Sequence, residues 1–166
     1  MTHAAALVVF FSRSGHTREV AQAIARRIDA PIEELLDPTP RGGVLGYARC
    51  SRDATLARAP AIAPLGHDLS RYELVIVGTP VWNASPSAPV RAFFARERAR
   101  LPRVAFFLTH GGFAARRVFA TMTALAGQRP IATLAVRRRH FERGEVDARV
   151  RGFAGVLSRA TSSADA

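Results

Sequence analysis

Lysine is missing from this sequence of 166 residues, so all 24 of its basic residues are arginine. A P-loop NTPase needs a lysine on the nucleotide phosphates, a protein kinase needs one on its third strand, and a pyridoxal phosphate enzyme needs one for its Schiff base. The absence of lysine excludes these three classes. Only 13 residues are acidic, and the net charge of +11 attracts anions such as phosphate esters, nucleic acids or acidic partners. The bias toward arginine also fits a GC-rich genome.

Cysteine is nearly absent as well. Cys50 is the only one, which excludes an intrachain disulfide and a cysteine zinc cluster and suits a reducing compartment. No apolar run reaches the roughly 18 residues that span a membrane, and the first residues lack the pattern of a signal peptide. We therefore expect a cytoplasmic protein without a membrane span. The histidines show no paired metal-ligand spacing, so we expect no metal site.

The length and composition fit one globular domain. Hydrophobic residues make up 48% of the chain and charged residues 22%, values close to those of packed soluble domains. We expect a single domain over residues 1–160 and a short flexible tail over residues 161–166.

Strand and helix patterns alternate along the chain. Short apolar runs predict strands over residues 6–11, 32–36, 72–78, 104–109 and 131–136. Helical spacing predicts helices over residues 17–28, 118–125 and 146–157, with another opened by Pro86 or Pro89. The alternation predicts an α/β protein with a doubly wound, five-stranded parallel sheet. The connection over residues 38–69 is too long for a bare loop, and residues 44–58 are compatible with an irregular helix.

Ligands of such sheets bind beyond the carboxyl ends of the strands. After the first strand, Ser12, Ser14 and Thr17 flank Gly15 and lead directly into a helix. Free N–H groups of a first helical turn, the helix dipole and neighbouring hydroxyls together suit a phosphate monoester. The same residue types also form ordinary turns and helix caps, so this loop alone leaves both interpretations open.

Two further loops follow strands at the same edge. Trp82, the only tryptophan, lies after the third strand, where it can stack on a planar ring or simply cover the end of the core. After the fourth strand, residues 109–112 read Thr-His-Gly-Gly and offer main-chain donors and acceptors to such a ring. The first, third and fourth strands therefore all end in groups that suit a phosphorylated heterocycle.

These loops resemble those of the flavodoxin-like FMN-binding family. Residues 12–17 match the family's hydroxyl-x-hydroxyl-Gly-x-Thr phosphate loop, residues 78–82 read Gly-Thr-Pro-Val-Trp as its second loop often does, and residues 109–112 are similar to its Ser/Thr-x-Gly-Gly loop. The resemblance covers residues 6 to about 157. It implies the strand order 2-1-3-4-5 and non-covalent FMN.

The resemblance also implies which residues bind the cofactor. Ser12, Ser14, Gly15 and Thr17 would hold the phosphate, and Trp82 would flank the isoalloxazine. Its polar edge would lie near Asn83, His110 and Gly111. The complete expected set is Ser12, Arg13, Ser14, Gly15, His16, Thr17, Pro80, Val81, Trp82, Asn83, Thr109, His110, Gly111 and Gly112. No catalytic side chain is assigned, because the flavin supplies the redox chemistry.

The implied function is electron or hydride transfer, with NAD(P)H as donor and a quinone-like molecule or redox protein as acceptor. The alternatives are a flavodoxin-type carrier, a protoporphyrinogen oxidase-like enzyme and a non-catalytic flavin-binding domain. Two features differ from those of electron-shuttling flavodoxins. Such flavodoxins are usually acidic, whereas this chain is basic. The connection of this chain over residues 38–69 resembles the variable segment of quinone-reductase-like members of the family. We expect no nucleic-acid partner, because no recognition module is present. A homo-oligomer is left open.

Other proteins with doubly wound sheets need groups that this chain lacks. A receiver domain needs acidic residues at the end of its first strand, which here ends in Phe10, Phe11 and Ser12. A low-molecular-weight phosphatase needs Cys-x5-Arg, but the sixth residue after Cys50 is Leu56. The Gly-x-Ser-x-Gly and Gly-x-Gly-x-x-Gly motifs are also missing. The arginine run at residues 137–139 is either a solvated loop or an anion-recruiting patch for a nicotinamide dinucleotide or an acidic partner.

Overall fold

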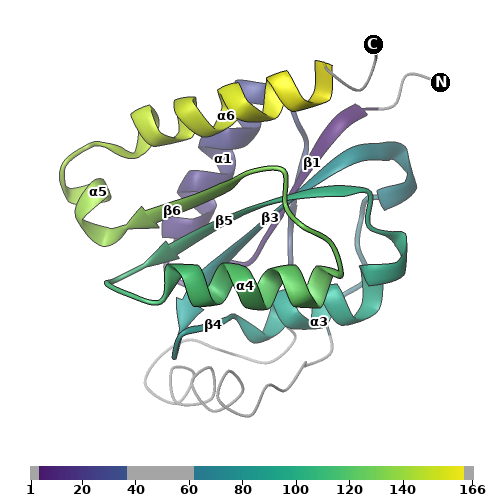
Figure 1. Ribbon diagram of the computed structural model, residues 1–166, viewed down its shortest axis with the longest axis horizontal. Helices are drawn as coiled ribbons and strands as arrows, with labels where there is room; N and C mark the ends of the chain where they lie inside the picture. The colour runs from purple at the N-terminus through teal and green to yellow at the C-terminus, as the bar shows by residue number, and fades with distance from the viewer. Residues whose placement is uncertain (1–3, 37–61, 163–166) are drawn as a thin grey trace.

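The computed structural model describes residues 4–36 and 62–162. Five parallel strands form its central sheet in the order β2-β1-β3-β5-β6 (Figure 1). Their bounds are β1 (Ala4–Phe10), β2 (Ile32–Glu34), β3 (Tyr72–Trp82), β5 (Arg103–His110) and β6 (Thr133–Arg137). Counted along the chain, this is the predicted order 2-1-3-4-5, so the doubly wound fold is confirmed. The expected helix over residues 44–58 lies outside the described residues.

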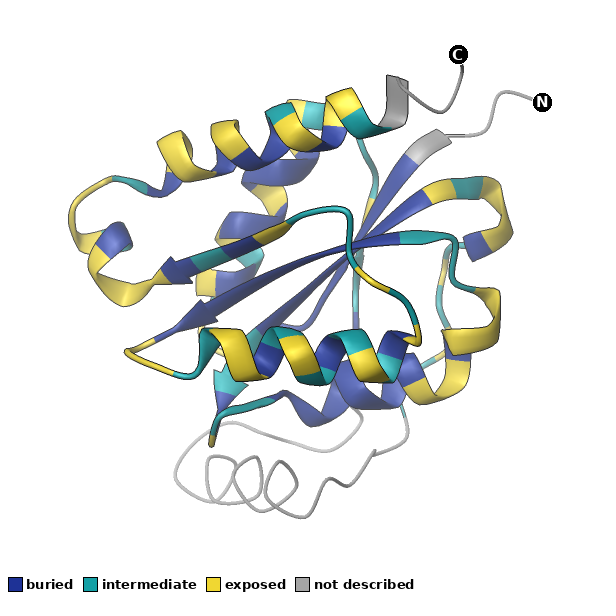
Figure 2. Ribbon diagram, in the orientation of Figure 1, coloured by how far each residue is buried: buried dark blue, intermediate teal, exposed yellow. Residues whose placement is uncertain are grey.

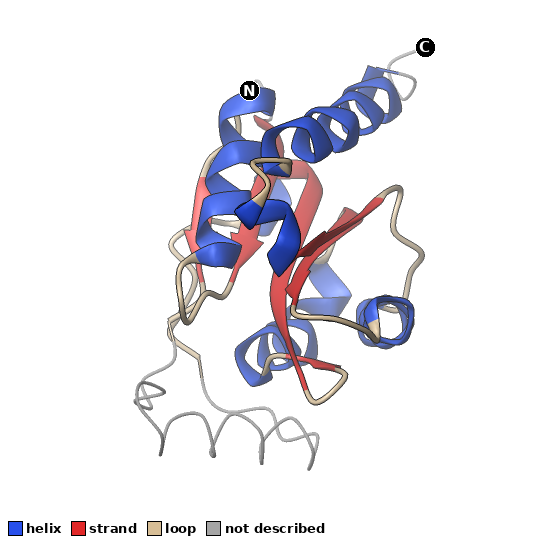
Figure 3. Ribbon diagram, turned by 90° about the vertical axis from the view of Figure 1, so that its left-hand side faces the viewer, coloured by secondary structure: helices blue, strands red, loops and turns tan. Residues whose placement is uncertain are grey.

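Helices cover both faces of the sheet. One face packs against α1 (His16–Ile28) and α6 (Val146–Ser162), and the other packs against α3 (Ala88–Glu97) and α4 (Ala115–Ala126) (Figure 3). Shorter elements are η1 (Leu69–Arg71), η2 (Arg98–Arg100) and α5 (Arg138–Glu142). None of the helices in the described ranges is long and apolar enough to cross a membrane.

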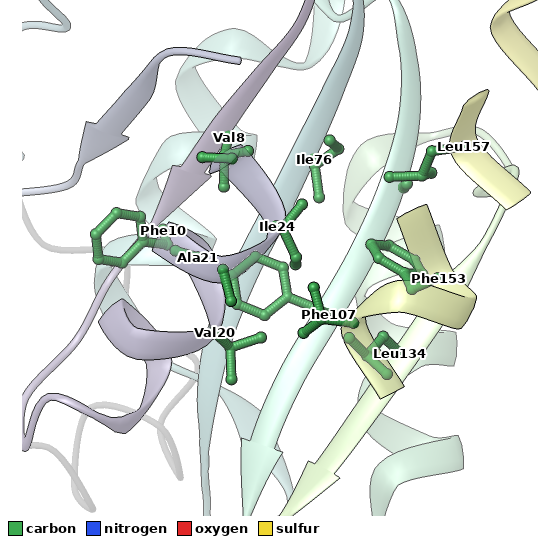
Figure 4. Close-up of a cluster of buried hydrophobic side chains, with 14 of the residues drawn as sticks. Val8, Phe10, Val20, Ala21, Ile24, Ile76, Phe107, Leu134, Phe153 and Leu157 are labelled. Atoms are coloured by element: carbon green, nitrogen blue, oxygen red, sulfur yellow. The ribbon is translucent and has the colours of Figure 1, made fainter. Parts of the chain in front are cut away.

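The strands are buried on both faces, which explains their continuous apolar sequences. In β1, Leu7 and Val9 join the core beneath α3 and α4, whereas Val8 and Phe10 join the core beneath α1 and α6. All four side chains are fully buried, and Figure 2 shows the same for most of the sheet. Figure 4 shows the second core, where Phe107 of β5 lies among side chains from α1 and α6.

One expectation about the third strand is wrong. The sequence predicts that the strand ends at Gly78, but β3 continues to Trp82 and turns back into the two-residue strand β4 (Ser85–Pro86). Asn83 and Ala84 have φ values of 48° and 55°, as a tight hairpin turn with two left-handed residues requires. Antiparallel pairing with β4 then keeps the end of β3 extended. Residues expected in a free loop therefore lie in a hairpin.

Several helix boundaries also differ from the predicted ones. Helix α3 begins at Ala88 with Pro89 in its first turn, α4 begins three residues before the predicted 118, and α6 includes Thr161 and Ser162. Helix α5 is not predicted at all, because its five residues are too few to show a period. Residues 163–166 lie outside the described part, so the flexible tail stays a prediction.

Candidate functional site

A cavity of about 360 Å³ lies at the carboxyl ends of β1, β3 and β5. It is lined by Ser14, His16, Pro80, Val81, Thr109, His110, Gly111, Arg138 and Phe141. All but the last two residues belong to the three loops singled out in the sequence. The fold therefore brings these loops to one cavity, whose volume lies at the lower end of the roughly 300–1,000 Å³ usual for small-molecule sites.

The first loop presents the amino end of α1 to this cavity. Gly15 is the N-cap residue with φ 97°, and no side chain of the described residues caps the helix. Ser12, which is nearly buried, accepts a hydrogen bond from the Gly15 N–H at 3.1 Å, and the Ser14 Oγ lies 3.2 Å from the His16 Nδ1. An uncapped helix end carries partial positive charge and free N–H groups, which suit an anion.

Two buried hydroxyls tie the first loop to the end of β5. The Oγ1 atoms of Thr17 and Thr109 are 2.8 Å apart, although the residues are 92 positions apart in the sequence. Their exposed fractions are 2% and 7%. This contact fixes the start of α1 against β5 and closes the floor between the two loops.

His110 is the polar group that most needs a ligand. Its side chain lines the cavity, the residue is 7% exposed, and neither ring nitrogen has a hydrogen-bond partner within residues 4–36 and 62–162. Burial lowers its pKa below the ordinary 6.5, the charges of Arg137 and of protonated His140 lower the pKa further, and a polar contact with the Phe113 backbone opposes these effects in part. A neutral imidazole has one donor and one acceptor, and buried groups of this kind are normally paired. An imidazole of this kind in the cavity wall suits a polar ligand.

Trp82 lies differently from the other expected site residues. It is 9% exposed, belongs to the core beneath α3 and α4, and packs edge to face on Phe11 with ring centroids 5.7 Å apart. It is not among the residues that line the cavity. This geometry corresponds to the interpretation in which the indole covers the end of the core, and its contact with a ligand stays a prediction. Arg13, Asn83 and Gly112 are exposed.

Sequence reasoning missed Arg138 and Phe141, which α5 adds to the cavity wall. The Phe141 ring packs on the His16 ring with centroids 4.7 Å apart and planes at 64°. The arginine run at residues 137–139 is the signal that could have found them, since it directly follows a strand. The run is not a loop, because β6 continues through Arg137 and α5 begins at the next residue, but its three arginines are exposed, as the solvated interpretation predicts.

A second cavity, larger than the first, lies at the opposite end of the sheet and is less suited to a ligand. It has about 470 Å³ and is lined by Pro64, Leu65, Gly66, His67, Asp68, Leu69, Arg96, Glu97 and Arg100. Its charges pair with each other: Arg96 Nε donates to Glu97 at 2.8 Å, and Arg100 Nη2 donates to Asp68 at 3.1 Å. The first pair lies within α3 and the second joins η2 to the start of η1, and together they leave little net charge for a ligand.

The buried histidines make stability sensitive to acid. Burial lowers the pKa of His140 as it does that of His110, so both bind fewer protons in the folded protein than in the unfolded chain. Stability therefore falls as the pH drops through 6.5. We expect the urea midpoint to decrease from roughly pH 7.5 to 5.5, and to decrease less in a His110→Gln variant. An equal decrease in both proteins would contradict this assignment.

Comparisons with known proteins support the fold. Neither models of protein families nor curated proteins give a match. Among solved structures, a Lactobacillus acidophilus NCFM flavoprotein in complex with FMN is similar with a TM-score of 0.69 and 23% identity, covering 84% of this chain and 97% of that one. A WrbA-like flavodoxin from Agrobacterium tumefaciens gives 0.61 and 18%, covering 93% and 98%.

A larger redox protein contains a similar domain. Rubredoxin oxygen:oxidoreductase from Desulfovibrio gigas gives a TM-score of 0.57 and 14% identity, covering 95% of this chain and 37% of that one. At these identities the likeness concerns the fold alone. The chain therefore has the flavodoxin-like fold, as its strand order also shows.

Proposed function

We propose that this protein binds FMN non-covalently in the cavity at the carboxyl ends of β1, β3 and β5 and transfers electrons or hydride through it. The observation that carries the proposal is a cavity that joins the amino end of α1 to the buried His110, and within the described residues the helix end has no side-chain cap and the two ring nitrogens form no hydrogen bond. The first feature suits a phosphate and the second suits a polar ligand group. Similar solved structures support it, because they are flavoproteins and one contains FMN.

The residues present fit this cofactor. The first-turn N–H groups of α1 would hold the phosphate together with Ser14, while Ser12 shapes the loop through its bond to the Gly15 N–H. Gly15 leaves open space where a side chain would otherwise intrude. His110 would hydrogen-bond the ligand from the cavity floor, and Pro80 and Val81 would contact it with apolar surface. Bound FMN would supply one- and two-electron redox chemistry.

We further propose that the protein is a reductase that oxidises NAD(P)H and passes the electrons to a quinone or a similar acceptor. The net charge of +11 supports an anionic donor, because it raises the local concentration of dinucleotide phosphates. The single cysteine supports a cytoplasmic location. A flavodoxin-type carrier, a protoporphyrinogen oxidase-like enzyme and a flavin-binding domain without activity are the competing functions.

Flavin titration and turnover test the two parts of this proposal separately. We expect FMN to bind the purified protein with heat release and with quenching of its fluorescence. Protein that stays colourless and gives no heat with FMN would exclude the cofactor. NAD(P)H oxidation is then followed with a panel of quinones. Turnover supports the reductase, whereas bound FMN without turnover favours a carrier or a binding domain.

A further inference from the structure

Helix α5 packs beside the amino end of α1. Phe141 of α5 packs on His16, the first residue of α1, with ring centroids 4.7 Å apart. Arg138 and Phe141 are three positions apart, so they lie on the same side of α5, and both line the cavity. Arg138 therefore lines the same cavity as Ser14 and His16, and its side chain is 77% exposed.

This end of the cavity already favours negative charge. Within the described residues the amino end of α1 has no side-chain cap, and its free N–H groups and partial positive charge favour an anion. The buried neutral imidazole of His110, whose ring nitrogens form no hydrogen bond in that part of the chain, adds one donor. Arg138 adds a full positive charge. Its Nε donates to Glu142 at 3.3 Å, which uses one of the five N–H donors of a guanidinium group. The planar fork suits a phosphate, which accepts two parallel hydrogen bonds.

We infer that Arg138 pairs with the phosphate group of FMN at the amino end of α1, so that charge helps the protein to select FMN over riboflavin. This inference rests on the proposed function. It separates Arg138 from its neighbour Arg139, which is also exposed but does not line the cavity. It also gives the arginine run a role different from recruiting a nicotinamide dinucleotide.

Matched charge-removing variants test the inference. Arg138→Gln and Arg139→Gln change the net charge equally and alter neighbouring positions of the same helix. Dissociation constants for FMN and riboflavin are measured by quenching of flavin fluorescence. For Arg138→Gln we expect FMN to bind about five- to tenfold more weakly and riboflavin to bind unchanged, because an exposed charge pair is partly screened. Arg139→Gln should leave both constants within about twofold.

Two further measurements separate a phosphate contact from other roles. Arg138→Lys keeps the charge without the planar fork, so its FMN affinity should fall between those of the wild type and Arg138→Gln. Added salt should weaken FMN binding to the wild type more than to Arg138→Gln.

The outcomes that overturn the inference are distinct from failure of the proposed function. Equal weakening of FMN and riboflavin would show that Arg138 acts through packing. Unchanged FMN binding with weaker NADPH binding would assign Arg138 to the dinucleotide. If the wild type binds neither flavin, the proposed cofactor itself is wrong, and this appears before any variant is made.

Discussion

Replacing Gly78 by alanine should destabilise the protein by about 3 kcal/mol and lower its Tm by roughly 10 °C. Gly78 of β3 pairs in register with Phe107 of β5, and a Cβ atom at Gly78 would overlap with the Phe107 ring. That ring is fully buried in the core beneath α1 and α6, so it has no space to move away (Figure 4). Urea denaturation and thermal unfolding measure the loss.

Two variants show whether the overlap is the cause. Gly152 lies in α6, and a Cβ atom there would meet no other atom of the described residues within 4 Å, so Gly152→Ala should stabilise the protein by roughly 0.5–1 kcal/mol. Phe107→Leu removes part of the ring, so Gly78→Ala should cost at least about 1 kcal/mol less in that background. Additive effects in the double variant would show that the ring is not what excludes a side chain at Gly78.

Gly15→Ala should weaken FMN binding by about ten- to a hundredfold, which corresponds to the loss of one or two charge-assisted hydrogen bonds. Gly15 has φ 97°, a conformation that costs an L-residue roughly 1–2 kcal/mol. A Cβ atom would meet no atom of the described residues within 4 Å, so the substitution acts through the loop conformation and through the space left for the phosphate. Isothermal titration calorimetry with FMN and urea denaturation measure the two effects.

Gly144 provides the matched control. It also has a positive φ, 67°, and open space around an added Cβ atom, but it lies between α5 and α6 and does not line the cavity. Gly144→Ala should therefore cost a similar 1–2 kcal/mol of stability and leave FMN affinity nearly unchanged. Equal loss of FMN affinity in both variants would mean that general destabilisation, not the shape of the first loop, controls binding.

Local sequence patterns predicted most of the secondary structure, because each buried element repeats a simple period. Residues buried on both faces gave β1, β3 and β5 their continuous apolar runs, and the spacing of Val20, Ala21 and Ile24 predicted α1. The end of β3 was missed because it depends on a hairpin turn at Asn83 and Ala84. Alanine is unusual in a left-handed turn conformation, so the sequence carried little signal.

Part of the candidate site could likewise be predicted from the sequence, and part depends on the tertiary structure. The sequence indicates three segments as candidate site residues, namely residues 12–17, 80–81 and 109–111. It can do so because the loops that follow parallel strands lie at one edge of the sheet. Which side chains enter the cavity is a matter of packing. Trp82 packs in the core. Phe141 packs on His16, and Arg138 of the same helix also lines the cavity. No local pattern encodes these choices.

The sequence by itself determined the alternation of strands and helices, the strand order implied by its motifs, and the positions of the loops. It could do so because burial periodicity and helix-starting loops are local properties of the chain. Only the tertiary structure decided that Thr17 contacts Thr109, that the buried ring nitrogens of His110 form no hydrogen bond among the described residues, and that Arg138 of α5 lines the cavity. These contacts join segments far apart in the sequence, so they exist only once the sheet has brought those segments together.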